Sequence, residues 1–300
     1  MSPIQRTAHI DQLLSSLSVK YRNEEYIADQ VFPTVMVKKQ SDLYRVHSRN
    51  FRLPETLAHS SGLAREHQFE VSSSSYVLQN HKLKDYISDD EQDNFDLSDL
   101  RAETTEELMD VILRRKEKAV ADLFTTTSWS QNVSLAAAWS SNTVTTNPIP
   151  TMDTAATTII HNSGKKPNYM ILPRAGFVSA KNHVSLLDRT KYTSKEMTAG
   201  IMAGLFDVEQ VLVPVSSIDS SAEGAADSVG SLWGSDIAFL GFKPARPAMR
   251  TPSAGYVFQK ATPTVRRWRE EEREADAIEV RLKFVPKVVA SLAGYLVKGV

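Results

Sequence analysis

Carboxylates at short spacing are the side chains of this sequence most suited to chemistry. The first such group is a single short run: Asp89, Asp90, Glu91 and Asp93. Hard cations such as Ca²⁺ and Mg²⁺ prefer oxygen ligands, so a metal-dependent hydrolase built on this run is one hypothesis. The run lacks the glycine and the distal glutamate of an EF-hand loop. We therefore favour a solvated acidic turn that precedes the next helix.

A second acidic group lies near the C-terminus, where Glu270, Glu271, Glu272 and Glu274 follow one another closely. Two carboxylates can serve as acid and base in hydrolysis. Here Arg269 and Arg273 alternate with the acids, which is typical of ion pairs between strands or between subunits. We interpret the group as a charged hairpin tip rather than a catalytic site.

Other catalytic and binding motifs are absent from the sequence. The 7 His never occur four residues apart, and we read His59 and His67, which flank a turn, as a chance pair rather than a metal site. No glycine-rich phosphate loop, HExxH or GxSxG is present. With 0 Cys, disulfides, thiolate zinc sites and a Cys nucleophile are excluded. We predict no catalytic, metal or cofactor-binding residue, and a protein that is not an enzyme.

Composition narrows the class of protein further. The chain has 300 residues, 41% of them hydrophobic, with 35 Lys and Arg against 36 Asp and Glu. A net charge of -1 argues against a protein whose main task is to coat nucleic acid. No apolar run is long enough for a transmembrane helix, and the first residues lack the apolar segment of a secretory signal. We expect a soluble protein made in a reducing cytoplasm.

Basic and apolar residues alternate between positions 38 and 85. Two such stretches, Asp42 to Leu53 and Glu66 to Leu78, flank a turn of small residues and predict a long β-hairpin. A two-stranded hairpin is only marginally stable alone, so we expect it to lie on its own body or on a neighbouring subunit. Contact with other copies is favoured over nucleic acid, because acids dilute the basic charge. The candidate contact residues of hairpin and tip are Arg45, Arg49, Arg52, Arg65, Glu66, Arg269, Glu270, Glu271, Glu272 and Arg273.

The remaining pattern predicts the elements that would position these residues. Thr104 and Glu107 have the spacing of a capping box at the start of a helix that runs to Phe124. A strand is predicted over 31–37, and a helix over 152–161. A strand–helix–helix–strand order is predicted for 167–215, followed by a surface loop over 216–231. Two long strands, 256–268 and 277–286, would flank the charged tip, and the apolar C-terminus would be packed.

The order of these blocks resembles that of the major capsid proteins of tailed bacteriophages with the Hong Kong 97-type fold. The opening phrase is ADQVFPTVMVKKQSDLYRVHSRNFRLPET (28–56), and the acidic turn and helix follow as YVLQNHKLKDYISDDEQDN (76–94) and TEELMDVILRRKEKAVADLF (105–124). Later blocks are KPNYMILPRAGFVSAKNH (166–183), GLFDVEQVLV (204–213) and VRRWREEEREADAIEVRLKFVPKVVASLAGYLV (265–297). The resemblance covers nearly the whole chain.

This resemblance implies an α+β fold with a defined division of the chain. The implied parts are an N-terminal arm and first strand (1–37), an extended β-hairpin loop (38–87), a peripheral domain (88–166) with a spine helix (104–124), an axial domain (167–258) and return strands of the peripheral domain (259–300). The capsid-like block starts by Val31, so any scaffold would be a separate protein or unnecessary. Lysines occur in or beside the loop, but no matched Asn or catalytic acid is evident, and we predict assembly without covalent cross-links.

The implied function is self-assembly into the icosahedral head shell of a phage around double-stranded DNA. The implied partners are copies of the chain in hexamers and pentamers, possible scaffolding, portal and decoration proteins, and DNA bound on the inner face without sequence specificity. No cofactor and no membrane is implied, and the shell would be assembled in the host cytoplasm and be part of the virion. An encapsulin-type nanocompartment shell is the alternative, and a metal-dependent hydrolase is a remote one.

Overall fold

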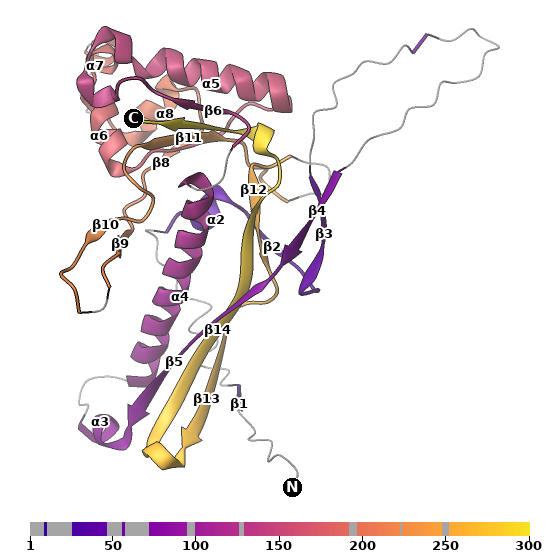
Figure 1. The fold of residues 1–300 in the computed structure, drawn as a ribbon, viewed down its shortest axis with the longest axis vertical. Helices are drawn as coiled ribbons and strands as arrows, with labels where there is room; N and C mark the ends of the chain where they lie inside the picture. Colours follow the sequence, from indigo (N-terminus) through magenta and orange to yellow (C-terminus); the bar gives the residue numbers. More distant parts are fainter. Residues whose placement is uncertain are drawn as a thin grey trace.

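The computed structural model describes residues 9–10, 26–46, 56–57, 72–94, 100–125, 129–191, 197–222, 224–247 and 252–300 (Figure 1). These residues form two lobes. One is a long twisted sheet with a single long helix beside it, and the other is a smaller sheet surrounded by short helices (Figure 1). A β-hairpin leaves the long sheet at one side (Figure 1).

The long sheet is organised around β14 (Ala275–Val288), which has partners along both edges. The strand order is β1-β13-β14-β12-β2, and β5 also pairs with β14. The bounds are β1 (His9–Ile10), β2 (Thr34–Met36), β5 (Gln79–Ser88), β12 (Gly255–Gln259) and β13 (Thr264–Glu270). All ladders to β14 are antiparallel, whereas β2 runs parallel to β12. Alternate β14 residues are buried along most of its length, the period-2 pattern of a strand with one covered face.

The long helix α4 (Leu100–Thr125) covers that face of the sheet. Its buried Met109 and Ile112 belong to one cluster with Ile278 and Val280 of β14. The prediction of a long helix is confirmed, but the predicted cap at Thr104 is wrong. The Thr104 hydroxyl donates to the carbonyl oxygen of Leu100 at 2.8 Å, so this residue lies inside the first turns of the helix.

The predicted acidic turn is instead a short helix, α3 (Asp89–Asn94). A reciprocal cap starts it: the Glu91 backbone N–H donates to the Ser88 hydroxyl at 3.3 Å, and the Ser88 N–H donates to the Glu91 carboxylate at 3.1 Å. This is the capping-box arrangement that the sequence pattern placed at Thr104. Aspartates in the first turn add a favourable interaction with the helix dipole.

The second lobe is built on a five-stranded sheet, in the order β6-β15-β11-β7-β8. Its strands are β6 (Asn132–Ser134), β7 (Tyr169–Ile171), β8 (Gln210–Leu212), β11 (Ile237–Gly241) and β15 (Gly294–Lys298). The helices are α5 (Pro148–Ser163), α6 (Arg174–Lys181), α7 (Val184–Thr190) and α8 (Ala199–Leu205), with 3₁₀ turns η1 (Trp139–Ser141) and η2 (Val144–Thr146). The two strands and two helices predicted for 167–215 are present as β7, α6, α8 and β8, but the structure has a third helix, α7, between α6 and α8 that was not predicted.

Strand pairing and core packing group several segments differently from the predicted division of the chain. The strand β15 pairs with β11 in the second sheet rather than returning to the long one, and β12 belongs to the long sheet. The helix α5, placed in the peripheral domain, packs in the core of the second lobe. The strand β5, placed in the hairpin loop, pairs with β14 for its whole length. Pairing between distant segments decides these memberships, and it leaves no mark in the local sequence.

Two shorter segments also differ from expectation. The predicted strand over 31–37 is shorter in the structure: β2 (Thr34–Met36) lies within this range, and Val31 ends a helical turn, α2 (Ala28–Val31). The predicted loop over 216–231 contains a two-stranded hairpin, β9 (Ser217–Asp219) and β10 (Val229–Ser231). A further 3₁₀ turn, η4 (Ser291–Ala293), leads into β15, and the packed C-terminus is confirmed by the burial of Leu296 and Val297.

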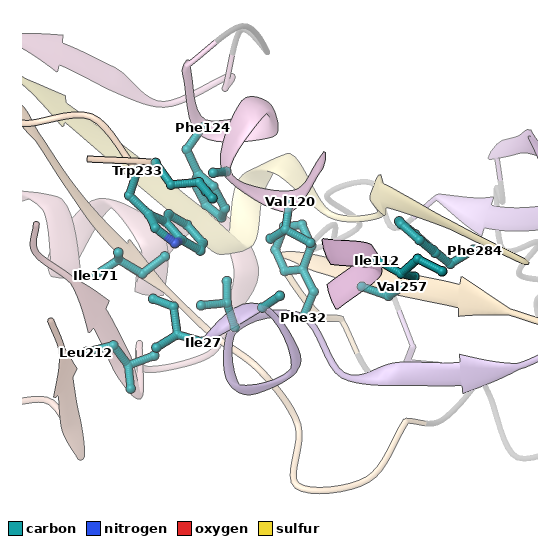
Figure 2. Close-up of a cluster of buried hydrophobic side chains, with 14 of the residues drawn as sticks. Ile27, Phe32, Ile112, Val120, Phe124, Ile171, Leu212, Trp233, Val257 and Phe284 are labelled. Carbon is teal, nitrogen blue, oxygen red and sulfur yellow. The ribbon is translucent and has the colours of Figure 1, made fainter. Parts of the chain in front are cut away.

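The two lobes share a core at the C-terminal end of α4 (Figure 2). Phe124 lies 4.6 Å from Phe239 of β11 and 5.5 Å from both Phe32 and Trp233, measured between ring centroids. Aromatic rings at these separations add to the stabilisation from area burial alone. The spine helix therefore joins the two sheets as well as covering one of them.

A buried carboxylate, Glu117, connects three segments near this core. It accepts hydrogen bonds from the backbone N–H groups of Ile27 (3.1 Å) and Ala28 (2.7 Å), and from the indole N–H of Trp233 (2.6 Å). Burial raises the pKa of this carboxyl above its usual value, against the lowering effect of these donors. The root of the N-terminal segment is thereby fixed to the spine helix. None of the helices in the described part of the chain is long and apolar enough to cross a bilayer.

Candidate assembly interface

The base of the hairpin is anchored to the long sheet by aromatic residues. Its strands β3 (Ser41–Val46) and β4 (Ser72–Val77) pair antiparallel along their whole length. Tyr76 stacks on Phe258 of β12 with ring centroids 4.6 Å apart, and Tyr44 lies 5.4 Å from the same ring. The Tyr44 hydroxyl also donates to the carbonyl oxygen of Val288 at 3.4 Å. These contacts fix the direction in which the hairpin leaves the body.

The opposite face of the hairpin base carries two exposed apolar side chains among serines and one arginine. Leu43 and Val77 lie on the face away from Tyr44 and Tyr76, and they are 68% and 61% exposed. Met36 of the neighbouring β2 is 57% exposed. Large apolar side chains gathered on a strand face are a mark of surfaces that contact another molecule.

Only one of the predicted hairpin contact residues lies within the described chain. Arg45 is exposed on β3, on the same face as Leu43. Arg49, Arg52, Arg65 and Glu66 lie outside the described residues, as do His59 and His67. The base of the predicted hairpin is confirmed, and the role of its distal residues stays a prediction.

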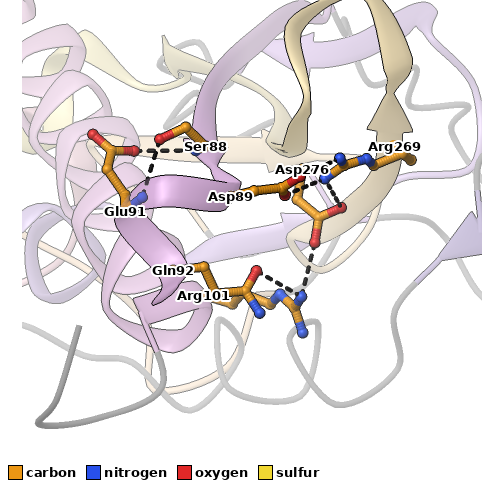
Figure 3. Close-up of polar contacts among 7 residues, drawn as sticks. All are labelled: Ser88, Asp89, Glu91, Gln92, Arg101, Arg269 and Asp276. Carbon is orange, nitrogen blue, oxygen red and sulfur yellow. Dashed lines mark hydrogen bonds and ion pairs between the residues drawn. The ribbon is translucent and has the colours of Figure 1, made fainter. Parts of the chain in front are cut away.

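The tip between β13 and β14 contains a network of ion pairs and hydrogen bonds (Figure 3). The Arg269 guanidinium donates two hydrogen bonds of 2.5 Å to the two carboxylate oxygens of Asp89 on α3. Asp276 of β14 accepts a bond of 2.9 Å from Arg101 of α4, which also bonds Gln92 at 3.1 Å. Strand, short helix and spine helix are thus joined at one end of the molecule (Figure 3).

This network engages Arg269 and two carboxylates of the acidic run in contacts within the subunit. The Arg269 hydrogen bonds are the main cause of the lowered pKa of Asp89, and the pKa of Arg269 is raised by the same bonds. Asp89 is committed to Arg269, and Glu91 to the cap at Ser88. No group of three or more His, Asp or Glu side chains converges on a metal position within the described ranges. The acidic run is part of the scaffold of the tip.

The rest of the tip is exposed and acidic. Glu271 and Glu272 belong to the 3₁₀ turn η3 (Glu271–Arg273), and Glu274 follows with a positive φ of 45°. The Arg273 guanidinium lies 4.5 Å above the ring of Tyr86, whereas Glu270 is half-buried beside it. Of the predicted tip residues, Arg269 is bound within the chain, and the exposed glutamates remain available to a partner.

Two parts of this surface are not among the features predicted from the sequence. The Ser88–Glu91 pair has the spacing of a capping box and could have been found by the same rule that was applied to Thr104. The aromatic anchors Tyr44 and Tyr76 occur at alternate positions of apparently exposed strands. No local signal reveals that their partner is Phe258, because the contact joins segments far apart in the chain.

Two phage proteins are similar to this chain over most of its length. The major capsid protein of Burkholderia phage BcepMu is 25% identical over 313 residues, an alignment that covers 100% of this chain and 99% of that protein. The major capsid protein of Pseudomonas phage JBD67 is 24% identical over 242 residues, covering 77% and 76%. No protein-family model matches the sequence. Both relatives are named as capsid proteins rather than enzymes.

Solved structures show the same fold. A crystal structure of a phage-related protein from Bordetella bronchiseptica RB50 superposes with a TM-score of 0.79 at 22% identity, covering 98% of each chain. The capsid structure of cyanophage P-SCSP1u gives a TM-score of 0.62 at 10% identity, covering 93% of this chain and 89% of that one. The chain shares the α+β fold of these two structures. The Hong Kong 97-type fold predicted from the sequence is therefore confirmed.

Proposed function

We propose that this chain is the major capsid protein of a tailed bacteriophage, which assembles into the icosahedral head shell around double-stranded DNA. The observation that carries the proposal is a similarity that extends over the whole chain, in sequence to a phage major capsid protein and in fold to phage capsids. The curated relatives are phage proteins, so a phage head is favoured over an encapsulin-type compartment.

The surface of the subunit supports assembly with copies of itself. Leu43, Val77 and Met36 expose apolar area where the hairpin leaves the body, at an anchored base that holds it in one direction. A neighbouring subunit is the partner that would bury this area in a shell. The hairpin residues Arg45, Arg49, Arg52, Arg65 and Glu66 and the tip residues Glu270, Glu271 and Glu272 would contribute polar contacts, and Arg273 would support the tip by packing on the ring of Tyr86. Arg269 would act by holding the tip in place.

The parts of the chain would divide the work in the shell. The lobe with the five-stranded sheet would surround the five- and six-fold axes, as hexamers and pentamers form. The long sheet and α4 would connect neighbouring capsomers, and the arm and hairpin would reach adjacent subunits. DNA would contact the inner face without sequence specificity. Scaffolding, portal and decoration proteins would be separate chains, with assembly in the host cytoplasm and no covalent cross-links between subunits.

Sedimentation of the full-length chain, expressed alone and with the scaffolding protein of its phage if one exists, tests the proposal. We expect a fast-sedimenting species that dissociates under denaturing conditions into chains of a single mass, because assembly is non-covalent. A chain that sediments only as a monomer under all assembly conditions would contradict the proposal. Portal and terminase genes beside the coding sequence would indicate a phage, and a gene for a cargo enzyme would indicate a compartment.

A further inference from the structure

The face of the long sheet that points away from α4 carries a row of basic side chains. Residues paired across neighbouring strands lie on the same face of a sheet, and the face alternates along each strand. Three sets of paired residues follow one another on this face, across β13, β14 and β5. They are Arg266–Glu279–Lys84, then Thr264–Arg281–Lys82, then Lys283–Asn80, the last set across β14 and β5 only. We call these five Lys and Arg residues the basic row.

The alternate residues show which face this is. Val280 and Leu282 of β14 are buried in the cluster that contains α4. His81, next to Lys82 on β5, stacks on the buried Phe284 with ring centroids 4.4 Å apart. Side chains between these positions must therefore point to the other side of the sheet. Lys82 and Lys84 are accordingly exposed.

Most of the charge of the basic row has no counterpart within the subunit. Arg281 donates to the carboxylate of Glu279 at 2.9 Å. Glu279 is the single acid among these paired residues. Lys84 donates to the hydroxyl of Tyr86, and this hydrogen bond, together with the charge of Glu270, raises the pKa of Lys84 above its usual value. Lys82, Arg266 and Lys283 form no ion pair with any residue that the structure describes. Uncompensated charge of one sign on a sheet face favours an anionic partner.

The tip of every copy of the chain carries acidic side chains, which are opposite in charge to the basic row. Its arginines are already engaged, Arg269 by Asp89 and Arg273 by the ring of Tyr86. Glu271, Glu272 and Glu274 remain exposed, and the turn that carries them is fixed by the 3₁₀ geometry and the left-handed Glu274. The three acids are thus exposed together at the end of the long sheet.

We propose that the acidic tip of one copy docks on the basic row of a neighbouring copy. This inference rests on the proposed function, because it requires copies to be neighbours in a shell. The two surfaces are different and complementary in charge, so the contact is heterologous, the type that closes into rings. A nucleic acid could also supply negative charge. We favour the tip as the partner, because every subunit carries one tip and one basic row, so each row in a shell can be matched by a tip.

A charge exchange tests the docking. The tip variant is Glu271→Lys with Glu272→Lys, and the row variant is Lys82→Glu with Lys283→Glu. Each should lower the yield of sedimenting particles about tenfold or more, because like charges then face each other across the contact. The chain that carries all four substitutions should regain most of the yield, since the charges attract again with reversed sign.

A matched control separates a local contact from overall charge. Lys165→Glu with Lys298→Glu alters the net charge by the same amount as the row variant, at two exposed positions in the lobe with the five-stranded sheet. It should assemble at the yield of the unmodified chain. Thermal unfolding followed by circular dichroism should show that all variants fold, because the substituted side chains are exposed or half-buried and make no hydrogen bond that the structure describes.

Three results would overturn the docking. One is a four-substitution chain as defective as the two-substitution chains. Another is a row variant that assembles at full yield, and a third is full yield with less nucleic acid in the particles, which would assign the row to nucleic acid. In each of these three results the unmodified chain still forms particles, so the docking fails while the proposed function stands. If the unmodified chain forms none, the proposed function and the docking fall together.

Discussion

At the scale of single residues, the buried carboxylate of Glu117 accepts hydrogen bonds from two other segments of the chain. Replacing it by alanine leaves three buried donors without an acceptor: the N–H groups of Ile27, Ala28 and Trp233. We expect Glu117→Ala to lower the free energy of unfolding by about 3 kcal/mol. Urea denaturation measures this value. Glu106→Ala, at an exposed position of the same helix, is the control and should change it by less than about 0.5 kcal/mol.

The same carboxyl predicts a pH dependence of stability. Its pKa in the folded chain is raised above the usual 4.5, so the unfolded chain releases this proton at a lower pH than the folded chain does. The folded state then binds more protons in this window, and stability must fall as the pH rises through it. The stability of the unmodified chain relative to Glu117→Gln should therefore decrease from pH 4.5 upward and then level off. An increase over that window would show that the donors outweigh burial.

Two glycines offer a matched test of packing at the residue scale. A Cβ added to Gly294 would meet the rings of Phe239 and Trp129, the latter at 2.9 Å. Gly294→Ala should therefore cost about 1–3 kcal/mol through overpacking of the shared core. Gly204 in α8 has nothing within 4 Å of an added Cβ. Gly204→Ala should stabilise by about 0.5–1 kcal/mol, since alanine is the better helix former. Thermal melting measures both effects. A melting temperature of Gly294→Ala at or above that of Gly204→Ala would contradict the packing described here.

At the scale of elements, the hairpin separates into a base that belongs to the subunit and a distal part that does not. Joining Val46 to Ser72, which are paired, through an Asn-Gly turn keeps Tyr44 and Tyr76 on Phe258. We expect this shortened chain to remain folded, with a melting temperature close to that of the full chain, and to form no stable shells. Circular dichroism and sedimentation measure the two properties.

A longer deletion provides the contrast. Removing Arg45 to Gln79 would also remove Tyr76 and Leu78, which are buried in the cluster around Phe258. That chain should be less stable than the shortened one. Shells formed by the shortened chain would show that the distal hairpin is not an assembly element, and unfolding of the shortened chain would show that it belongs to the core.

The elements that could be predicted from the sequence are those defined by local periodicity. The helix α4 shows a clear helical repeat, and the tip is marked by alternating Arg and Glu. The membership of β15 and β5 could not be predicted, because it depends on pairing with β11 and β14 over long separations. The Arg269 partner could not be predicted either. Asp89 lies 180 positions away, and only the folded sheet brings the two together.

At the scale of the whole molecule, the net charge is close to zero, but positive and negative side chains are concentrated on different surfaces. The chain carries 35 basic and 36 acidic side chains, yet the basic row and the acidic tip each concentrate one sign. A subunit that must contact identical neighbours needs both signs on different surfaces, and their sum is then close to zero. Such contacts are individually weak and add up through the many copies in a closed shell. Shell yield should consequently decrease as ionic strength increases, because exposed charges are screened.

Electron microscopy of the full-length chain, purified after expression alone and with any scaffolding protein, tests the central claim most directly. The account predicts closed shells of uniform size with icosahedral symmetry, in which the five-stranded-sheet lobes surround the symmetry axes. A monodisperse monomer under every assembly condition, or only irregular aggregates, would contradict it.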